Sequence, residues 1–187
     1  VVLASYDTEL FGHGWKEGIY WLEVTLRSLA NCSAVRMVTP SAYLEGNPPD
    51  RSAELAQSTW GTGKDSSTWL NQQTRWMWED LAEVESRMFM LAGRRPGARL
   101  AARALEQLER EVLLLESSDW PYMVAKDRAK EYSIERFQTH LERFEAVAGA
   151  LEQGELEKEE SKLSEIEEVD NLFSPLDLKS VFGPCDP

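Results

Sequence analysis

Residues 77–91, MWEDLAEVESRMFML, decide the fold class of this 187-residue chain. Apolar side chains recur in this stretch every three or four positions, at Met77, Leu81, Val84, Met88 and Leu91. This spacing places them on one face of an α-helix and leaves the charged residues on the other face. We therefore predict a long amphipathic helix that needs partner helices to bury its apolar face.

Two further stretches downstream share this periodicity. Their apolar positions are Ala101, Ala104, Leu108, Val112 and Leu115, then Phe137, His140, Leu141, Phe144, Val147 and Leu151. The connections at residues 93–97 and 117–121 are short and contain glycine, proline or serine. Three long helices with short connections are typical of a bundle. We expect His140 to be a buried histidine whose hydrogen bonds are satisfied within the protein.

The N-terminal stretch has a different character. Residues 1–6, VVLASY, are mostly apolar and predict a parallel strand that is buried on both faces. Helical spacing follows from Trp15, and a strand followed by a helix is half of a β/α repeat. In barrels of such repeats the active site lies at the carboxyl ends of the strands, which is where Asp7 and Glu9 fall. Thr39-Pro40 predicts the start of another helix.

These patterns predict a mainly α chain with two domains. Residues 1–70 are expected to be the C-terminal end of an incomplete β/α barrel, with its terminal strand and loops. Residues 71–187 are expected to form a helical-bundle domain. An apolar strand at the first residue also predicts that the front of the barrel precedes this chain.

Composition excludes several classes of function. A net charge of -13 argues against nucleic acid and anionic membranes as partners. No apolar run approaches the roughly 20 residues of a transmembrane helix. Two histidines and two distant cysteines, Cys32 and Cys185, make a zinc site improbable, and they favour a cytoplasmic setting. Residues 152–170 contain nine acids and two lysines, which predicts a solvated charged helix.

Several residues suggest carbohydrate chemistry. Asp7 and Glu9 are two positions apart and would share one side of a strand, and paired carboxylates cleave glycosidic bonds. His13 lies between two glycines, so its ring has room to approach a ligand. Trp60 and Trp69 lie in a polar, glycine-bearing loop, where they would either stack on sugar rings or pin the loop to the body.

Three ordered motifs bring these clues together: YDTELFGHGW from residue 6, STWGTGKDSSTWLN from residue 58 and ESSDWPYM from residue 116. Together they resemble the C-terminal part of family 57 glycoside hydrolases, and among these the 1,4-α-glucan branching enzymes. The later runs AKEYSIERFQTHLERF and DNLFSPLD resemble the same family, so the resemblance covers nearly the whole chain. The two loop tryptophans have the family's nine-residue separation.

The resemblance implies roles for individual residues. Asp7 matches the general acid/base of a retaining mechanism that uses no cofactor and no metal. Trp60 and Asp119 match residues that contact the glucan, Asp119 from a helical domain that closes over the cleft. From the residues alone, Asp119 is interpreted simply as a cap for the turn that begins at Trp120-Pro121. The remaining substrate-binding candidates are His13, Trp15, Trp69, Glu9 and Arg128.

Departures from the family pattern occur at Gly14, Lys64 and Arg128. Gly14 replaces a tryptophan, Lys64 replaces a loop glycine, and Arg128 replaces a sugar-contacting glutamine. Arginine donates hydrogen bonds but cannot accept them. The family's nucleophilic glutamate lies earlier in the barrel. Glu9 is not a substitute, because it would face the same way as Asp7, about 7 Å away along a strand.

The resemblance predicts the C-terminal part of a branching enzyme that acts on amylose or glycogen and is inactive without the barrel segment that carries the nucleophile. Two alternatives remain open. One is a family 57 α-amylase or 4-α-glucanotransferase, and the other is a non-catalytic helical module that binds α-glucan.

Overall fold

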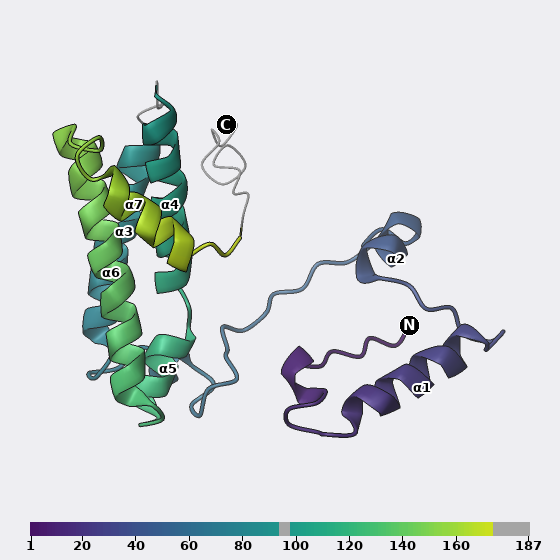
Figure 1. Ribbon diagram of the computed structural model, residues 1–187. Helices are drawn as coiled ribbons and strands as arrows, with labels where there is room; N and C mark the ends of the chain where they lie inside the picture. The colour runs from purple at the N-terminus through teal and green to yellow at the C-terminus, as the bar shows by residue number, and fades with distance from the viewer. Residues whose placement is uncertain (94–97, 174–187) are drawn as a thin grey trace. The chain divides into compact units, whose positions relative to one another are not determined.

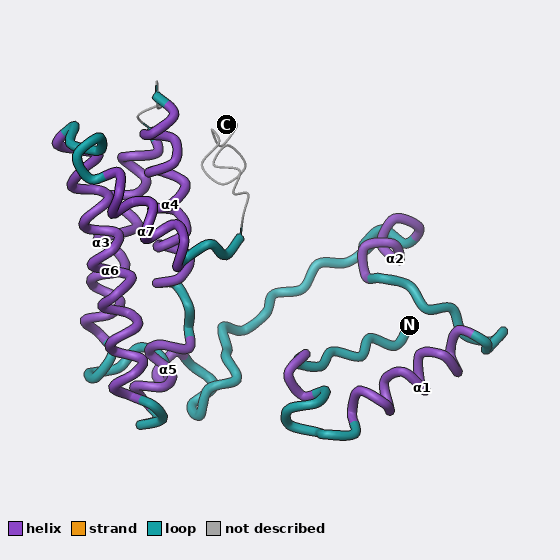
Figure 2. Tube along the Cα trace, viewed as in Figure 1, coloured by secondary structure: helices purple, strands orange, loops and turns teal. Residues whose placement is uncertain are grey.

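The computed structural model describes residues 1–93 and 98–173, and all regular elements within these ranges are helical (Figures 1 and 2). The mainly α fold class is therefore confirmed. The α-helices are α1 (Gly18–Ala30), α2 (Pro40–Gly46), α3 (Arg75–Ala92), α4 (Arg99–Leu115), α5 (Asp119–Ala125), α6 (Lys130–Gln153) and α7 (Glu160–Val169). Two short 3₁₀ helices are η1 (Thr8–Leu10) and η2 (Ser66–Thr68). The chain divides into two compact units, residues 1–55 and 56–187.

The predicted strand at residues 1–6 is wrong. These residues form no strand, because no other segment within the described ranges pairs with their backbone. A lone extended segment in water lacks the ladder hydrogen bonds that stabilise a sheet. The predicted side-by-side placement of Asp7 and Glu9 on a strand is wrong for the same reason, since Glu9 lies inside η1.

The other elements of the first unit match the predicted helices. Helix α1 occupies the stretch with helical spacing, and several of its apolar side chains, such as Ile19 and Val24, are exposed. Helix α2 begins as its sequence predicts. The Thr39 hydroxyl accepts a hydrogen bond from the Ala42 N–H at 3.2 Å, and Pro40 occupies the first turn.

The second unit is built around α3, α4 and α6, which run side by side (Figure 1). The predicted apolar face of α3 is buried throughout, at Met77, Leu81, Val84, Met88 and Leu91. Leu108 of α4 and Phe137 and Phe144 of α6 meet this face in the core. The helical-bundle prediction is confirmed for this part of the chain, and each long helix contributes one apolar stripe.

The acidic stretch near the C-terminus is more than a solvated helix. Leu163 and Ile166 of α7 are buried in the core cluster. Arg103 of α4 ties the outer face of α7 down, with contacts of 2.8 Å to Glu160 and 2.6 Å to Glu167. The predicted charged helix is therefore present with most of its charged side chains exposed, and the burial of Leu163 and Ile166 docks it on the bundle, which the sequence did not predict.

Helix α5 is short and is fixed by its neighbours. The Trp120 indole N–H donates to the Leu114 carbonyl of α4 at 2.8 Å. The Ser133 hydroxyl of α6 donates to the Trp120 carbonyl, also at 2.8 Å. A role for Asp119 as the side-chain cap is wrong, because α5 begins at Asp119 itself and Ser118 holds the cap position.

Among the described residues, no helix is both long enough and apolar enough to cross a membrane. Cys32 is exposed, and Cys185 lies outside the described residues, as does part of the DNLFSPLD run.

Candidate functional site

Asp7, the candidate general acid/base, lies at the start of a tight turn in the first unit. Its carbonyl accepts the Leu10 N–H at 3.1 Å, which opens η1. Two bonds close the turn, from the Gly12 N–H to the Trp15 carbonyl at 2.9 Å and from the Trp15 N–H to the Leu10 carbonyl at 2.7 Å. Gly12 has a φ of 99°, which favours glycine. This turn gathers the candidates Asp7, Glu9, His13 and Trp15.

The three ionisable candidates on this turn are all exposed. Asp7 makes no side-chain cap with η1, so its carboxylate is available to a ligand. An aromatic group lies beside it. The Phe11 and Trp21 rings are stacked at 6.4 Å between centroids, and Trp15 lies 5.3 Å from Trp21. The turn therefore combines free carboxylates with an aromatic surface.

In the second unit, the loop at residues 59–70 is ordered by its own polar groups. The Thr59 hydroxyl donates to the Asp65 carbonyl at 2.6 Å and accepts the Gly61 N–H at 3.1 Å. The Asp65 carboxylate accepts the Ser67 N–H at 3.0 Å. Hydrogen bonds from Ser67 hold the pKa of Asp65 below its usual value. The loop is thus a compact structure despite its glycine content.

Trp69 is the inner tryptophan of this loop and is half-buried. Its carbonyl accepts the Thr74 hydroxyl at 2.6 Å and the Trp78 indole N–H at 2.9 Å. Gly61 allows its ring to approach the loop backbone. A Cβ at Gly61 would lie 2.9 Å from Trp69 Cζ3 and 2.7 Å from Thr68 Oγ1. The geometry fits the pinning role for Trp69.

Trp60 is different, because its side chain is 74% exposed. Its ring makes a T-shaped contact with Trp69, at 4.7 Å between centroids and an interplanar angle of 88°. It also contacts Tyr122 of α5 at 5.4 Å, and Tyr122 lies 6.3 Å from Trp69. We call these three residues the aromatic platform. Its outer ring is open to solvent and has the chemistry needed to stack on a sugar ring.

Polar groups flank the aromatic platform on α5 and on the turn that follows it. Asp119 is exposed in the first turn of α5 and accepts the Ser117 hydroxyl at 3.3 Å. Lys126 donates to the Thr62 hydroxyl at 3.1 Å and so links α5 to the loop. Arg128 is exposed on the turn before α6. Carboxylate, ammonium and guanidinium groups together offer both acceptors and donors to sugar hydroxyls.

The candidates therefore fall into two groups. Asp7, Glu9, His13 and Trp15 lie on one turn of the first unit, whereas Trp60, Trp69, Asp119 and Arg128 lie in the second unit. Sequence reasoning missed Tyr122 and Lys126. A signal was present for Tyr122, because it follows Asp119 by three residues and three-residue spacing places side chains on one helix face.

A buried polar network joins α4 to α6 in the same unit. Arg110 Nη1 donates to Gln107 Oε1 at 2.6 Å, and Gln107 Nε2 donates to Glu111 Oε1 at 2.7 Å. His140 Nδ1 lies 2.8 Å from the other Glu111 oxygen, and Arg136 Nη2 lies 2.9 Å from His140 Nε2. Arginine can only donate, so Nε2 accepts and the Nδ1–H donates to Glu111. The prediction of a buried, hydrogen-bonded His140 is confirmed, at 1% exposure.

Glu111, His140 and Asp170 could in principle hold a metal ion, since their ligand atoms lie within 4.8 Å of one another. The surrounding charges oppose this. Arg143 pairs with Asp170, and Arg136 occupies the outer nitrogen of His140, where a metal-bound histidine would need an acceptor. Burial raises the pKa of Glu111, and the two hydrogen bonds that it accepts counteract this effect. The group fits a structural network better than a metal centre.

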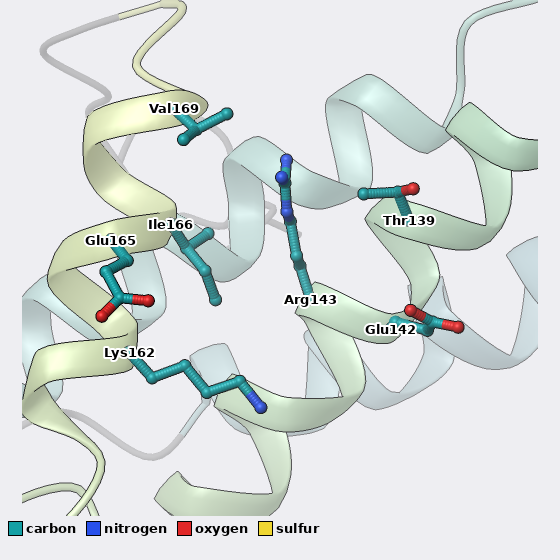
Figure 3. Close-up of a pocket in the computed structure, with 7 residues that line it drawn as sticks. All are labelled: Thr139, Glu142, Arg143, Lys162, Glu165, Ile166 and Val169. Atoms are coloured by element: carbon teal, nitrogen blue, oxygen red, sulfur yellow. The ribbon is translucent and has the colours of Figure 1, made fainter.

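A groove of about 330 Å³ lies between α6 and α7 on this unit (Figure 3). Its lining residues are Thr139, Glu142, Arg143, Lys162, Glu165, Ile166 and Val169. Lys162 extends from α7 toward α6, and Arg143 rises from α6 between the two helices (Figure 3). None of the lining side chains is aromatic, so this groove lacks the stacking surface that the aromatic platform provides.

Comparison with known proteins identifies the family. Residues 80–181 match the family model described as 1,4-alpha-glucan branching enzyme, C-terminal. The chain belongs to this family. It is 38% identical, over 98% of its length, to a 1,4-alpha-glucan branching enzyme of Thermococcus kodakarensis. It is 34% identical, over 95% of its length, to a probable 1,4-alpha-glucan branching enzyme of Mycobacterium tuberculosis.

Solved structures agree with this assignment. The GH57-type branching enzyme of Pyrococcus horikoshii matches 97% of the chain with a TM-score of 0.79 and 37% identity. The GH57 branching enzyme of Thermococcus kodakaraensis, in complex with glucose and additives, matches 97% with a TM-score of 0.77 and 37% identity. The alpha-amylase AmyC of Thermotoga maritima matches 97% with a TM-score of 0.72 and 26% identity.

The chain spans only part of these relatives. It covers 27% of the Thermococcus kodakarensis enzyme and 35% of the Mycobacterium tuberculosis protein. It covers 34% of the Pyrococcus horikoshii chain. The chain thus corresponds to the C-terminal region of family 57 branching enzymes, as the sequence motifs predicted.

Proposed function

We propose that this chain is the C-terminal part of a retaining 1,4-α-glucan branching enzyme. The enzyme cleaves an α-1,4 link in an amylose- or glycogen-like chain and transfers the released segment to a 6-hydroxyl as an α-1,6 branch. The observation that carries this proposal is the family match over residues 80–181. The glucose in the Thermococcus kodakaraensis structure supports an α-glucan as the substrate.

The two groups of candidate residues take different roles in this proposal. Residues 1–70 belong to the catalytic barrel, and Asp7 protonates the leaving oxygen and then activates the acceptor hydroxyl. Glu9, His13 and Trp15 line the glucan-binding cleft on the same side as Asp7. An exposed carboxylate on an ordered turn next to aromatic rings is suited to this work.

Residues 71–187 form the helical domain that covers the cleft. Trp60, on the loop that precedes this domain, stacks on a glucose ring, and Trp69 supports the Trp60 ring by direct contact. Asp119 accepts and Arg128 donates hydrogen bonds to sugar hydroxyls. A glucan-bound surface of rings and polar groups excludes water, which favours transfer to a sugar over hydrolysis.

The nucleophile comes from residues outside this chain. A retaining enzyme holds its two carboxyl groups about 5–5.5 Å apart on opposite sides of the scissile bond. Asp7 and Glu9 share one turn and cannot flank a bond in this way. Glucan cleavage therefore requires the barrel segment that carries the nucleophilic glutamate, and this chain by itself does not turn over.

The proposal is tested in the longer protein that contains this chain. That protein is incubated with amylose, and the α-1,6 linkages in the product are counted after enzymatic debranching. Asp7→Asn should lower the rate by roughly 10²–10⁴-fold, while Asp50→Asn, an exposed change in the same unit, should leave it unchanged. Near-normal branching by Asp7→Asn would remove Asp7 from the mechanism.

A family 57 amylase is the second candidate, favoured by the match to AmyC. The same assay separates the two, because an amylase releases reducing ends without new α-1,6 linkages. A non-catalytic binding module would bind maltoheptaose in the full-length protein and change neither quantity.

A further inference from the structure

The aromatic platform holds its exposed tryptophan in an unusual way. Trp76, Trp78 and Trp120 each donate their indole N–H to a backbone carbonyl, at 3.1, 2.9 and 2.8 Å. Within residues 1–93 and 98–173, the Trp60 indole makes no such bond, so hydrogen bonding does not set its orientation. The ring is held by its contacts with Trp69 and Tyr122.

These two contacts have different geometry and so constrain different motions. Trp69 meets Trp60 at an interplanar angle of 88°, an edge-to-face contact. Tyr122 approaches at 57° from α5. Because one contact comes from the loop and the other from a helix, the ring is fixed relative to both. The Trp60 side chain remains 74% exposed, so these two contacts leave most of its surface open to a ligand.

We propose that Tyr122 is a positioning residue for glucan binding, which orients the Trp60 ring so that a glucose unit can stack on it. This inference rests on the proposed function and adds a residue that the sequence motifs did not assign. Tyr122 acts through Trp60, and its ring rather than its hydroxyl performs this role. Removing the ring leaves Trp60 free to rotate in solvent and raises the entropic cost of stacking.

The place of Tyr122 on α5 gives this arrangement a second consequence. Tyr122 and Asp119 are three residues apart in the same helix, so the carboxylate and the ring share one face of α5. The same helix thus supports the stacking surface and carries a hydrogen-bond acceptor for sugar hydroxyls. Lys126, at the end of α5, bonds to Thr62 and keeps the loop in register with this face.

Fluorine NMR of the 187-residue chain labelled with 5-fluorotryptophan tests the positioning step without any ligand. The Trp60 signal is assigned by its loss in Trp60→Phe. Tyr122→Leu should shift and narrow this signal, whereas Tyr122→Phe should leave it near its original position. Tyr132→Leu is the matched control, since Tyr132 contacts Trp120 at 6.4 Å. It should move the Trp120 signal and not that of Trp60.

Maltoheptaose titrations of the same variants test the link to binding. Tyr122→Leu should weaken binding roughly 2- to 10-fold, the range of one aromatic contact, and Tyr122→Phe should restore it. Trp60→Ala should weaken binding roughly 5- to 100-fold. Adding Tyr122→Leu to Trp60→Ala should then have no further effect, because a residue that acts through Trp60 has nothing left to position.

The outcomes separate this inference from the proposed function. An unchanged Trp60 fluorine signal in Tyr122→Leu, or the same loss of affinity with and without Trp60, would overturn the positioning role alone. If the wild-type chain and the longer protein both fail to bind maltoheptaose, the glucan platform itself is wrong. A moved Trp60 signal together with a non-additive loss of affinity supports both.

Discussion

Replacing Glu111 by glutamine changes a single atom at the centre of the buried network between α4 and α6. Glu111 accepts two hydrogen bonds, one from Gln107 and one from the His140 Nδ1–H. An arginine hydrogen bond on the far side of each of these two residues determines which of its atoms can donate to Glu111. Arg110 donates to the Gln107 carbonyl oxygen, and Arg136 donates to His140 Nε2. Both ends of the network therefore point their donors at Glu111.

A glutamine cannot satisfy this arrangement. One of its two terminal atoms is an NH₂ group, so one donor always faces another donor. Turning the Gln107 amide around only moves the conflict to Arg110, and changing the His140 tautomer moves it to Arg136. An unsatisfied buried polar group costs about 1–3 kcal/mol.

Two effects oppose this loss. Burial raises the pKa of Glu111 and so does the nearby Asp170 carboxylate, so glutamine removes a desolvation cost and a like-charge repulsion. The two accepted hydrogen bonds already offset part of that cost. We expect a net loss of about 2 kcal/mol in the free energy of unfolding, which lowers Tm by about 4–8 °C for a domain of this size.

The assay is thermal unfolding followed by circular dichroism at neutral pH. Glu142→Gln on the exposed side of α6 is the control and should change Tm by no more than about 1 °C. Arg136→Leu is the informative background, because it frees His140 Nε2 to carry the proton and Nδ1 to accept from an amide. Glu111→Gln should cost less there. An unchanged Tm, or an equal cost in both backgrounds, would refute the assigned donor directions.

Three further predictions concern single side chains. Gly61→Ala should lower the free energy of unfolding by about 1–3 kcal/mol and weaken maltoheptaose binding, because the new Cβ would lie 2.7 Å from Thr68 Oγ1. Gly46→Ala is the control. No atom lies within 4 Å of its Cβ position, so thermal melts and maltoheptaose titrations should be unchanged. Partial burial and the charge of Glu85 raise the pKa of Glu116 above 4.5, so the folded protein loses stability as pH rises through that pKa. Glu116→Gln should therefore raise Tm at pH 7 and have little effect at a low pH at which the glutamate is already protonated; an equal gain at both pH values would contradict this. Arg103→Lys should lower the hydrogen-exchange protection of amides in α7, because it removes the two hydrogen bonds that the guanidinium donates to Glu167, at 3.1 and 2.6 Å. The protection of amides in α3 is the internal reference.

The long helices could be predicted because their information is local. The periodicity of residues 77–91 fixes a helix and its buried face without reference to any other part of the chain. The strand at residues 1–6 failed because a strand depends on a partner that its own sequence does not specify. Helix α7 was underestimated for a related reason, since burial of Leu163 and Ile166 depends on α4 lying next to it.

The residues of the candidate site likewise divide into those that the sequence could predict and those that it could not. Trp60 and Trp69 stood out because large aromatic residues in a polar loop are unusual, and Asp7 and Glu9 because of their spacing. Lys126 could be found only from the folded structure, since Lys126 and Thr62 are 64 residues apart in sequence. A contact between residues so far apart in sequence produces no local periodic pattern, so only the folded structure reveals the contact.

The position of the aromatic platform derives from the bundle rather than from α5 itself. A seven-residue helix is too short to be stable in isolation, so α5 takes its place from its contacts. Both anchors of α5 converge on Trp120, through its indole N–H to α4 and its carbonyl to α6. The His140 ring lies 6.5 Å from Trp120, so the buried network borders the same anchor. Polar groups that fix how α4 and α6 face each other therefore also influence where α5 holds Asp119 and Tyr122, and under the proposed function the buried charges would support the glucan-binding surface as well as the bundle.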